Sequence, residues 1–255
     1  MKLLLTNDDG INAKGLYALA KELEKDYEIV IAAPDNQRSA CGHSITISDP
    51  LFVKEVEING IKSKAYSVSG TPADCVRIGI DKLADGKIDM VLSGINNGFN
   101  LGTDVIYSGT VSAAIEAAIY NIPSMAVSTD VNDDIEKYAV AAKYASQILK
   151  SVKGNYIKDD VVINVNVPLI PKEKINGIKV CNIGSRTYNN YFIEEIDENN
   201  DRKFYLKGKL NDFDYENTDI YYIKRDYVTV TPLHYDLTNF KILDEVSNMF
   251  NEVET

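Results

Sequence analysis

Residues 2–12 read KLLLTNDDGIN, an apolar run that ends in two adjacent aspartates and a glycine. A short apolar run bounded by turn residues predicts a buried strand over residues 2–6. Ligands of open parallel sheets bind beyond the carboxyl ends of the strands, so we expect Asp8 and Asp9 at the edge of a crevice. Two adjacent carboxylates raise each other's pKa unless a cation or hydrogen-bond donors compensate. A divalent metal is the simplest compensation; the alternative is one helix-capping and one solvated aspartate.

Short β-rich runs alternate with segments of helical period through the first 170 residues. This alternation is typical of βαβ units and a largely parallel sheet. The predicted fold class is α/β, a Rossmann-like three-layer sandwich with a mainly parallel sheet. Strands are predicted at 2–6, 28–33, 88–93, 124–128 and 161–167, and helices at 13–25, 72–83, 110–120, 133–152 and 240–250. Around Asn59-Gly60, alternating residues within 45–68 predict a hairpin with a type I′ turn.

After Gly184 the sequence becomes rich in tyrosine, asparagine and charge, with an alternating pattern, as in TYNNYFIEEIDENNDRKFYLKGKL at 187–210. This pattern predicts a long hairpin arm with little core of its own. Because an isolated two-stranded ribbon is marginally stable, we expect the arm to pack on a neighbouring subunit. We therefore divide the chain into a Rossmann-like catalytic core, 1–184, and a segment 185–255. The second segment, with the arm, a final strand and a terminal helix, serves oligomerisation and is not an independent domain.

The chain is acidic, with 27 Lys and Arg against 38 Asp and Glu and a net charge of -11. That balance argues against binding a nucleic-acid polymer or an anionic membrane through a basic face.

No apolar stretch approaches the roughly 18 residues of a membrane span, and the leucine run is too short for a signal peptide. Three widely spaced cysteines indicate reduced thiols. We therefore expect a cytoplasmic protein. Because the chain is acidic, the binding of an anionic substrate needs a local source of positive potential.

Polar residues also follow two further predicted strands. The stretch APDNQRSACGHSIT, 33–46, offers Ser39 and Ser44 after the second strand. The stretch INNGFNLGTDVIYSGT, 95–110, combines four polar side chains with glycines before a predicted helix: Asn96, Asn97, Asn100 and Asp104. Polar residues at three successive strand ends are typical of a binding site and are not explained by turns alone.

Five motifs together resemble the SurE family (survival protein E), metal-dependent nucleoside 5′-monophosphate phosphatases. They are TNDDG (6–10), APDNQRS (33–39), SGTPADCV (69–76), SGINNGFNLGTDVIYSGTVSAAIEAA (93–118) and VTVTPLHYD (228–236). Their joint order is far more specific than any one of them, and they extend over nearly the whole chain. Two positions depart from the family pattern, since Ala40 and Ala117 stand where a glycine is common.

The resemblance implies particular roles for individual residues. One divalent metal per subunit would be held by Asp8, Asp9, Ser39 and Asn96. The phosphate would bind near Asn96, Ser108, Gly109 and Thr110. Family members are dimers or tetramers, so the resemblance also implies a homodimer or homotetramer in which the C-terminal hairpin and helix exchange between subunits.

The residue types themselves suit this chemistry. Two carboxylates, an amide oxygen and a hydroxyl form a hard, all-oxygen ligand set, which favours Mg²⁺ or Mn²⁺, with Ca²⁺ as an alternative occupant, over Zn²⁺ or Cu²⁺. With two histidines in the chain, a histidine-rich zinc or di-iron site is excluded. The metal and the N-terminus of the helix near Ser108 would supply the positive potential for a phosphate. Metal-activated water would attack the phosphorus, with Asp8 or Asp9 accepting its proton.

The predicted activity is that of a 5′-nucleotidase, a phosphomonoesterase acting on nucleoside 5′-monophosphates, with 3′-monophosphates and short polyphosphate as further candidate substrates. The alternative is a non-catalytic, metal-dependent nucleotide sensor. An aspartyl-phosphate phosphatase would need two aspartates separated by one residue, and a dinucleotide-binding enzyme would need G-x-G-x-x-G; both are missing here. His43 is a candidate substrate contact or a loop histidine satisfied by backbone. Tyr107 is a candidate for base stacking or packing, and Ser108 suits an N-cap as well as a phosphate.

Overall fold

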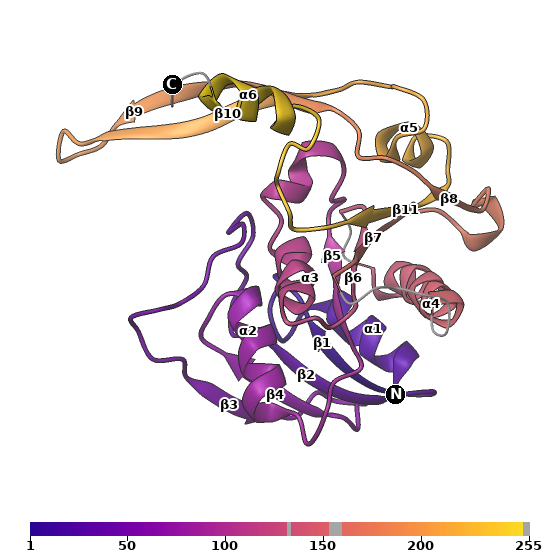
Figure 1. Ribbon diagram of the computed structural model, residues 1–255. Coiled ribbons are helices and arrows are strands. Elements are labelled where there is room, and N and C mark those ends of the chain that lie inside the picture. The colour runs from indigo at the N-terminus through magenta and orange to yellow at the C-terminus, as the bar shows by residue number, and fades with distance from the viewer. Residues whose placement is uncertain (132–133, 153–159, 252–255) are drawn as a thin grey trace.

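The computed structural model describes residues 1–131, 134–152 and 160–251 (Figure 1). Its central sheet has nine strands, which are in chain order β1 (Lys2–Thr6), β2 (Glu28–Pro34), β3 (Val53–Val56), β4 (Lys64–Val68), β5 (Met90–Asn97), β6 (Ser124–Thr129), β7 (Val162–Val167), β8 (Ile178–Val180) and β11 (Val228–Leu233). Their spatial order is β3-β4-β2-β1-β5-β6-β7-β11-β8. The strands from β4 to β7 in that order are all parallel, whereas β3 and β11 run antiparallel to their neighbours β4 and β7.

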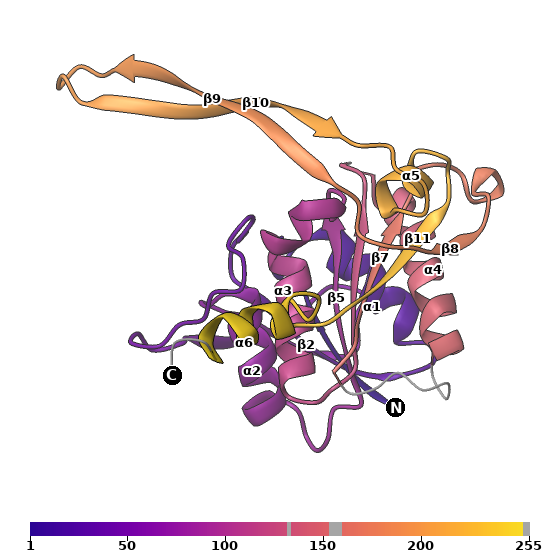
Figure 2. The same cartoon turned by 45° about the horizontal axis from the view of Figure 1, so that its top comes forward.

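Helices cover both faces of the sheet, as Figures 1 and 2 show. Helices α1 (Lys14–Leu23) and α4 (Ile135–Val152) pack together on one face, and α2 (Pro72–Ile78) and α3 (Gly109–Ile119) on the other. The first strand explains this layering, because its side chains alternate between the faces. Leu3 and Leu5 belong to the core under α1 and α4, and Leu4 belongs to the core under α2 and α3. The predicted α/β three-layer sandwich is therefore confirmed.

Most of the predicted elements are present with shifted ends. Predicted strands 2–6, 28–33, 124–128 and 161–167 agree with β1, β2, β6 and β7 to within one residue. Strand β5 is longer than predicted, since Asn96 and Asn97 continue it and pair with β6 beyond an irregularity at Gly94. The predicted helix 72–83 continues from α2 into a π-helical turn, Gly79–Leu83. The predicted helix 133–152 begins at residue 133, which lies outside the described residues, and α4 starts at Ile135.

The hairpin predicted within 45–68 is present as the antiparallel pair β3 and β4, but its turn is not type I′. Gly60 has a positive φ of 82°, and Asn59 does not adopt a positive φ. A type I′ turn requires positive φ at both central residues. The prediction of turn type was wrong because an Asn-Gly pair also suits turns in which the glycine alone is left-handed.

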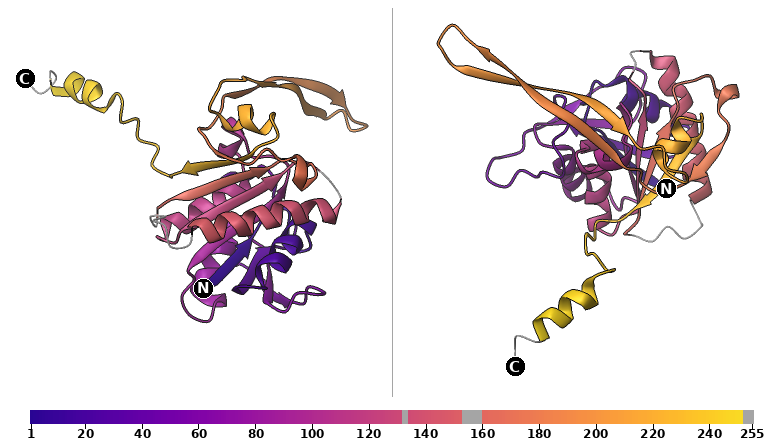
Figure 3. Two further views of the ribbon diagram at one scale, coloured as in Figure 1. Left: turned by 90° about the vertical axis from the view of Figure 1, so that its right-hand side faces the viewer. Right: turned by 90° about the horizontal axis from the view of Figure 1, so that it is seen from above.

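The predicted arm is an antiparallel ribbon of β9 (Arg186–Ile196) and β10 (Arg202–Asp212) that projects well beyond the sheet (Figures 2 and 3). The terminal helix α6 (Leu243–Asn251) leaves the body in a different direction (Figure 3). Between them, β11 returns to the central sheet and lies between β7 and β8. The sequence reading did not predict β8 or the short helix α5 (Asp219–Ile223), which precedes β11. In the described part of the chain, no helix has the length and apolarity needed to cross a membrane.

Candidate active site

A cavity of about 640 Å³ lies where the loops after β1, β2 and β5 meet the arm. Four of the predicted metal and phosphate ligands line it: Asp8, Ser39, Asn96 and Ser108. Aromatic and apolar side chains line the same cavity: Phe99, Tyr107, Tyr188 and Leu206. The sheet thus brings together residues that are up to 100 positions apart, such as Asp8 and Ser108, as expected for the carboxyl ends of parallel strands.

Asp8 is a buried carboxylate, with 4% of its surface exposed. The Thr110 hydroxyl donates to its Oδ1 at 2.5 Å, and the Arg38 backbone N–H donates to its carbonyl at 2.7 Å. Burial raises the pKa of Asp8 to about 6, the neighbouring charge of Asp9 adds to the rise, and the bond from Thr110 opposes it. The side chain is thus held in an environment that favours its neutral form unless a cation approaches.

Asp9 is bound to the loops after β2 and β5. Its Oδ2 accepts from the Asn97 backbone N–H at 2.9 Å, and its Oδ1 accepts from Gln37 Nε2 at 3.3 Å. The same Gln37 amide donates to Ser39 Oγ at 2.9 Å, so it joins two of the predicted metal ligands. Burial raises the pKa of Asp9 also, while its bonds from Asn97 and Gln37 act in the opposite direction.

The donor set fits a hard divalent cation. In the described residues, the side-chain and backbone donors that contact the two carboxylates come from Thr110, Asn97 and Gln37, and all are neutral. Nowhere in the described ranges do three His, Cys, Asp or Glu side chains gather as a metal-binding group. A protein ligand set here would therefore consist of two carboxylates completed by the neutral oxygens of Ser39 and Asn96, a combination of the kind that Mg²⁺ or Mn²⁺ prefers.

Helix α3 begins directly against Asp8. Ser108 is its N-cap, because its Oγ accepts from the Val111 backbone N–H at 3.1 Å. A Cβ atom on Gly109 would lie 2.8 Å from Asp8 Cβ, so no larger residue fits without displacing the carboxylate. The first backbone N–H groups of the helix and the positive end of its dipole thus lie beside Asp8. A helix N-terminus of this kind would suit an anion even within an acidic protein.

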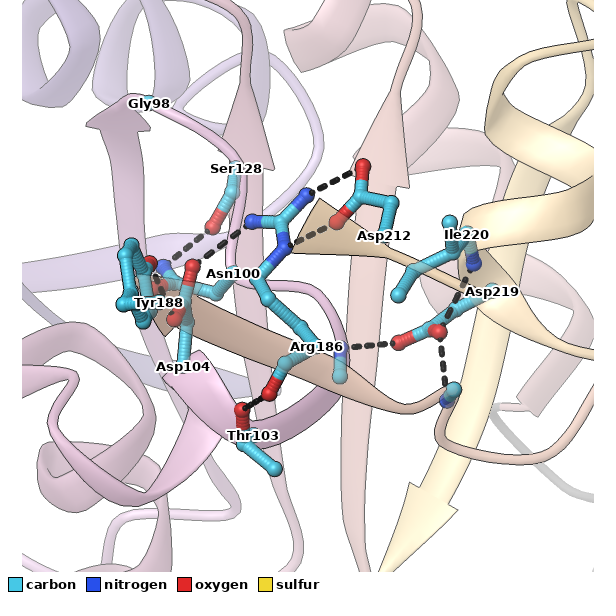
Figure 4. A network of polar contacts seen from close by, with 12 residues as sticks. Gly98, Asn100, Thr103, Asp104, Ser128, Arg186, Tyr188, Asp212, Asp219 and Ile220 are labelled. Carbon is cyan, nitrogen blue, oxygen red and sulfur yellow. Dashed lines mark hydrogen bonds and ion pairs between the residues drawn. The ribbon is translucent and has the colours of Figure 1, made fainter. Parts of the chain in front are cut away.

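The loop after β5 is held in place by buried side chains of β6 and β7. Asn164 and Asn166 each donate from Nδ2 to the Asn100 carbonyl at 3.0 Å. In return, the Asn100 backbone N–H donates to Asn166 Oδ1 at 2.9 Å, and its side-chain amide donates to Ser128 at 2.7 Å (Figure 4). Because buried polar groups are costly when unpaired, these reciprocal bonds fix the loop that forms one wall of the cavity.

The family model described as "Survival protein SurE" matches residues 3–190 of this chain. The chain belongs to the SurE family. It is similar to "5'-nucleotidase SurE" of Clostridium tetani, with 54% identity covering 98% of this chain and 100% of the relative. The protein of the same name from Clostridium botulinum is 53% identical, covering 98% and 99% of the two chains. The crystal structure of the SurE protein from Aquifex aeolicus has a TM-score of 0.83 at 38% identity, covering 98% of this chain and 99% of that chain.

Two of the predicted phosphate-binding residues and the candidate substrate contact His43 lie apart from the cavity wall. Gly109 and Thr110 lie against Asp8 without lining the cavity. His43 is bound to Glu116, with 2.6 Å between Nε2 and Oε2, and lines a second cavity, of about 600 Å³, together with His234. The structure therefore does not bring His43 to Asp8.

Other residues around this cavity of the SurE protein were not predicted from the sequence. Gln37 belongs to the motif APDNQRS (33–39), but the sequence does not predict that its side chain binds both Asp9 and Ser39. Tyr188, Asn190 and Leu206 line the cavity from the arm. Their alternating pattern indicated only a ribbon, and nothing in it predicts that the ribbon lines this cavity.

Proposed function

We propose that this SurE protein is a metal-dependent 5′-nucleotidase that hydrolyses nucleoside 5′-monophosphates to nucleoside and phosphate. Relatives that are 53% and 54% identical over nearly their whole length carry the name 5'-nucleotidase SurE. The observation that carries the proposal is the contact between Asp8, whose side-chain donors among the described residues are neutral, and the N-terminus of α3 at Gly109 and Thr110. As further substrates of the same site we propose 3′-monophosphates and short polyphosphate, which present the same terminal phosphate.

Asp8, Asp9, Ser39 and Asn96 would hold one Mg²⁺ or Mn²⁺ ion per subunit, with Ca²⁺ as an alternative occupant. When bound, such an ion neutralises phosphate charge and makes water a stronger nucleophile. The chain's own groups then have separate tasks. An N-cap serine uses its oxygen as acceptor and keeps an O–H to donate, so Ser108 would donate to a phosphate oxygen. Asn96 and the N–H groups of Gly109 and Thr110 would orient the phosphate, and Asp8 or Asp9 would accept the proton of the attacking water.

The arm supports a proposal about assembly. Apolar side chains are exposed on β9, β10 and α6, including Phe192, Ile193, Phe204, Met249 and Phe250. Because a two-stranded ribbon is marginal alone, we propose that arm and terminal helix pack on, or exchange with, another copy of the chain in a homodimer or homotetramer. The free thiols of Cys41, Cys75 and Cys181 suit a reducing compartment, and we propose a cytoplasmic location.

The decisive experiment measures phosphate release from AMP by the full-length protein after chelation, with and without added Mn²⁺ or Mg²⁺. Release is expected to depend on the metal, and Asp8→Asn and Asp9→Asn are expected to lose activity on the order of 100-fold or more. Asp81→Asn is the matched control, because Asp81 is an exposed aspartate paired with Lys82 away from the cavity. Near-normal activity in both site variants would refute the site. Metal-dependent nucleotide binding without phosphate release would favour the nucleotide sensor.

A further inference from the structure

A buried ion-pair network lies where the arm leaves the body of the molecule (Figure 4). Arg186, the first residue of β9, has 9% of its surface exposed. Its Nε donates to Asp212 Oδ1 at 2.7 Å and its Nη1 donates to Asp104 Oδ2 at 2.6 Å. Asp212 is the last residue of β10 and pairs with Arg186 in the ribbon, whereas Asp104 belongs to the 3₁₀ turn Gly102–Ile106 of the core. The guanidinium thus joins both strands of the arm to the core.

Tyr188 is bound to the same network. Its hydroxyl donates to Asp104 Oδ1 at 2.5 Å, so both oxygens of Asp104 receive a donor from β9. Burial together with the bond to Asp104 raises the pKa of Tyr188 to about 12, which keeps the hydroxyl protonated and donating at neutral pH. The hydroxyl is fixed, yet 44% of the residue remains exposed.

The position of this tyrosine connects the network to the active site. Tyr188 and Asp104 line the same cavity as Asp8 and Ser108. The network is also anchored from behind, since Thr103 Oγ1 donates to the Arg186 carbonyl at 2.6 Å. Hydrogen bonds to charged groups hold a side chain more firmly when they are shielded from water than when they are exposed to solvent. The ring is therefore held as a fixed part of the cavity wall.

The cavity is lined by polar residues and by a separate set of aromatic and apolar residues. Its carboxylates and the N-cap serine suit a metal and a phosphate, and the remaining aromatic and apolar residues have no task in that chemistry: Phe99, Tyr107, Tyr188 and Leu206. Aromatic side chains bind nucleobases by stacking, and every base has a π-face, so such contacts accept different bases. A wall of this type would favour a phosphate ester that carries a base over one that does not.

We propose that Tyr188 is a specificity-determining residue that stacks on the base of a nucleoside monophosphate, and that Arg186 and Asp104 are positioning residues that hold it in place. This inference rests on the proposed nucleotidase function. It assigns to the base of the arm a direct part in substrate choice, in addition to any part the outer arm has in assembly.

The test compares kcat and KM for AMP and for ribose 5-phosphate, which has the same phosphate and sugar and no base. In the wild-type protein, AMP is expected to have the lower KM. Tyr188→Ala should raise the KM for AMP about tenfold, as expected for loss of one stacking contact, with less than about a twofold effect on ribose 5-phosphate. Tyr188→Phe keeps the ring and loses the bond to Asp104, so it should raise the KM for AMP by a smaller factor. Arg186→Gln also keeps the ring and weakens only its positioning, so it should resemble Tyr188→Phe in KM.

Tyr191→Ala is the matched control, because Tyr191 is an exposed tyrosine of the same strand that does not line the cavity. Circular dichroism and light scattering establish that each variant is folded and has the wild-type mass. If Arg186→Gln fails to fold, Asp104→Asn takes its place, and the Tyr188 variants decide by themselves. An unchanged KM for AMP in Tyr188→Ala, or an equal rise for both substrates, would overturn the inference while leaving the nucleotidase function intact. Absence of turnover of AMP by the wild-type protein would overturn both.

Discussion

At the scale of single residues, the candidate active site combines features that are unfavourable for folding in the absence of a ligand. Asp8 is buried, lies next to a second carboxylate and touches the start of α3 at Gly109. An isolated carboxylate loses hydration free energy on burial, and its hydrogen bond from Thr110 compensates only in part. Such groups are retained at functional sites because a ligand makes use of them.

We predict that Asp8→Asn stabilises the chelated protein at pH 8. The pKa of Asp8 is raised from 3.8 to about 6 in the folded state. The ionised form is therefore disfavoured on folding, and the penalty is fully present above about pH 6 and disappears as the pH falls towards 4. A shift of about two pKa units corresponds to roughly 3 kcal/mol as an order of magnitude.

Denaturant unfolding in EDTA at several pH values measures this difference. The gain of Asp8→Asn over the wild type should be largest at pH 8 and should shrink towards pH 4, with Asp81→Asn as the exposed control. A variant that is less stable than the wild type at pH 8, or a gain that does not vary with pH, would contradict the prediction.

Two alanines that stand where the family commonly has glycine are expected to respond oppositely to substitution. Ala40, exposed next to Ser39, has a positive φ of 54°, which costs about 1–2 kcal/mol for a residue with a Cβ. Ala117 lies buried within α3. Ala40→Gly should stabilise the protein by about 0.5 kcal/mol after the extra flexibility of glycine in the unfolded chain is subtracted. Ala117→Gly should destabilise it by about 1 kcal/mol or more. Thermal unfolding of both variants distinguishes them, and a change of the same sign would count against this account.

At the scale of elements, the arm is the least supported part of the fold. Its strands β9 and β10 pair with each other and with no other strand of the described sheet topology, and nearly all their side chains are exposed. Among the described residues, the bonds that hold the arm on the core lie at its base, where Arg186 and Tyr188 bind Asp104 and where Asp219 binds the backbone of Gly102 and Gly184 (Figure 4). The arm therefore contributes to the candidate active site near its base, and its outer part is where we propose contact with a second copy of the chain.

We predict that Phe192→Asp lowers the oligomeric mass. Phe192 is 66% exposed on the outer arm, and a charge placed there opposes burial in a subunit interface. Light scattering should give a dimer or tetramer for the wild type and a smaller species for the variant. Glu195→Gln is the control, since it changes an exposed polar side chain of the same strand. A monomeric wild-type protein would exclude assembly through the arm.

At the scale of the whole molecule, net charge and site chemistry oppose each other. The chain has a net charge of -11, so its overall field repels a nucleoside monophosphate. The positive potential at the cavity comes from the N-terminus of α3 and, when bound, from the divalent cation. Metal binding is therefore expected to compensate the buried carboxylates and to attract the substrate at the same time.

We predict that Mn²⁺ or Mg²⁺ raises the melting temperature of the wild-type protein. A ligand present at 100 times its Kd stabilises the folded state by about 2.7 kcal/mol, which corresponds to roughly 5–10 °C for a chain of this size. Asp9→Asn should lose most of this shift, whereas Asp81→Asn should keep it. Differential scanning fluorimetry measures the shift without reference to activity, and equal shifts in all three proteins would show that the cation binds elsewhere.

The sequence by itself determined the α/β class, most elements of the core and the position of Asp8 and Asp9 at a strand end. These features are local, because alternation and helical period report which face of a strand or helix is buried, and a polar pair directly after an apolar run marks the strand's end. The hairpin arm was predicted for the same reason. The type of turn at Asn59-Gly60, between β3 and β4, in contrast depended on a backbone conformation, because Asn-Gly suits more than one type of turn.

Only the tertiary structure decided how distant segments complete the site. Arg186 and Asp104 are separated by 82 residues, and no local pattern in either segment predicts that they meet. The insertion of β11 between β7 and β8, the bond between His43 and Glu116 and the place of Tyr188 in the cavity are contacts of the same kind. They depend on how packed layers bring chain segments together, which is a property of the whole core and is not encoded at any single position.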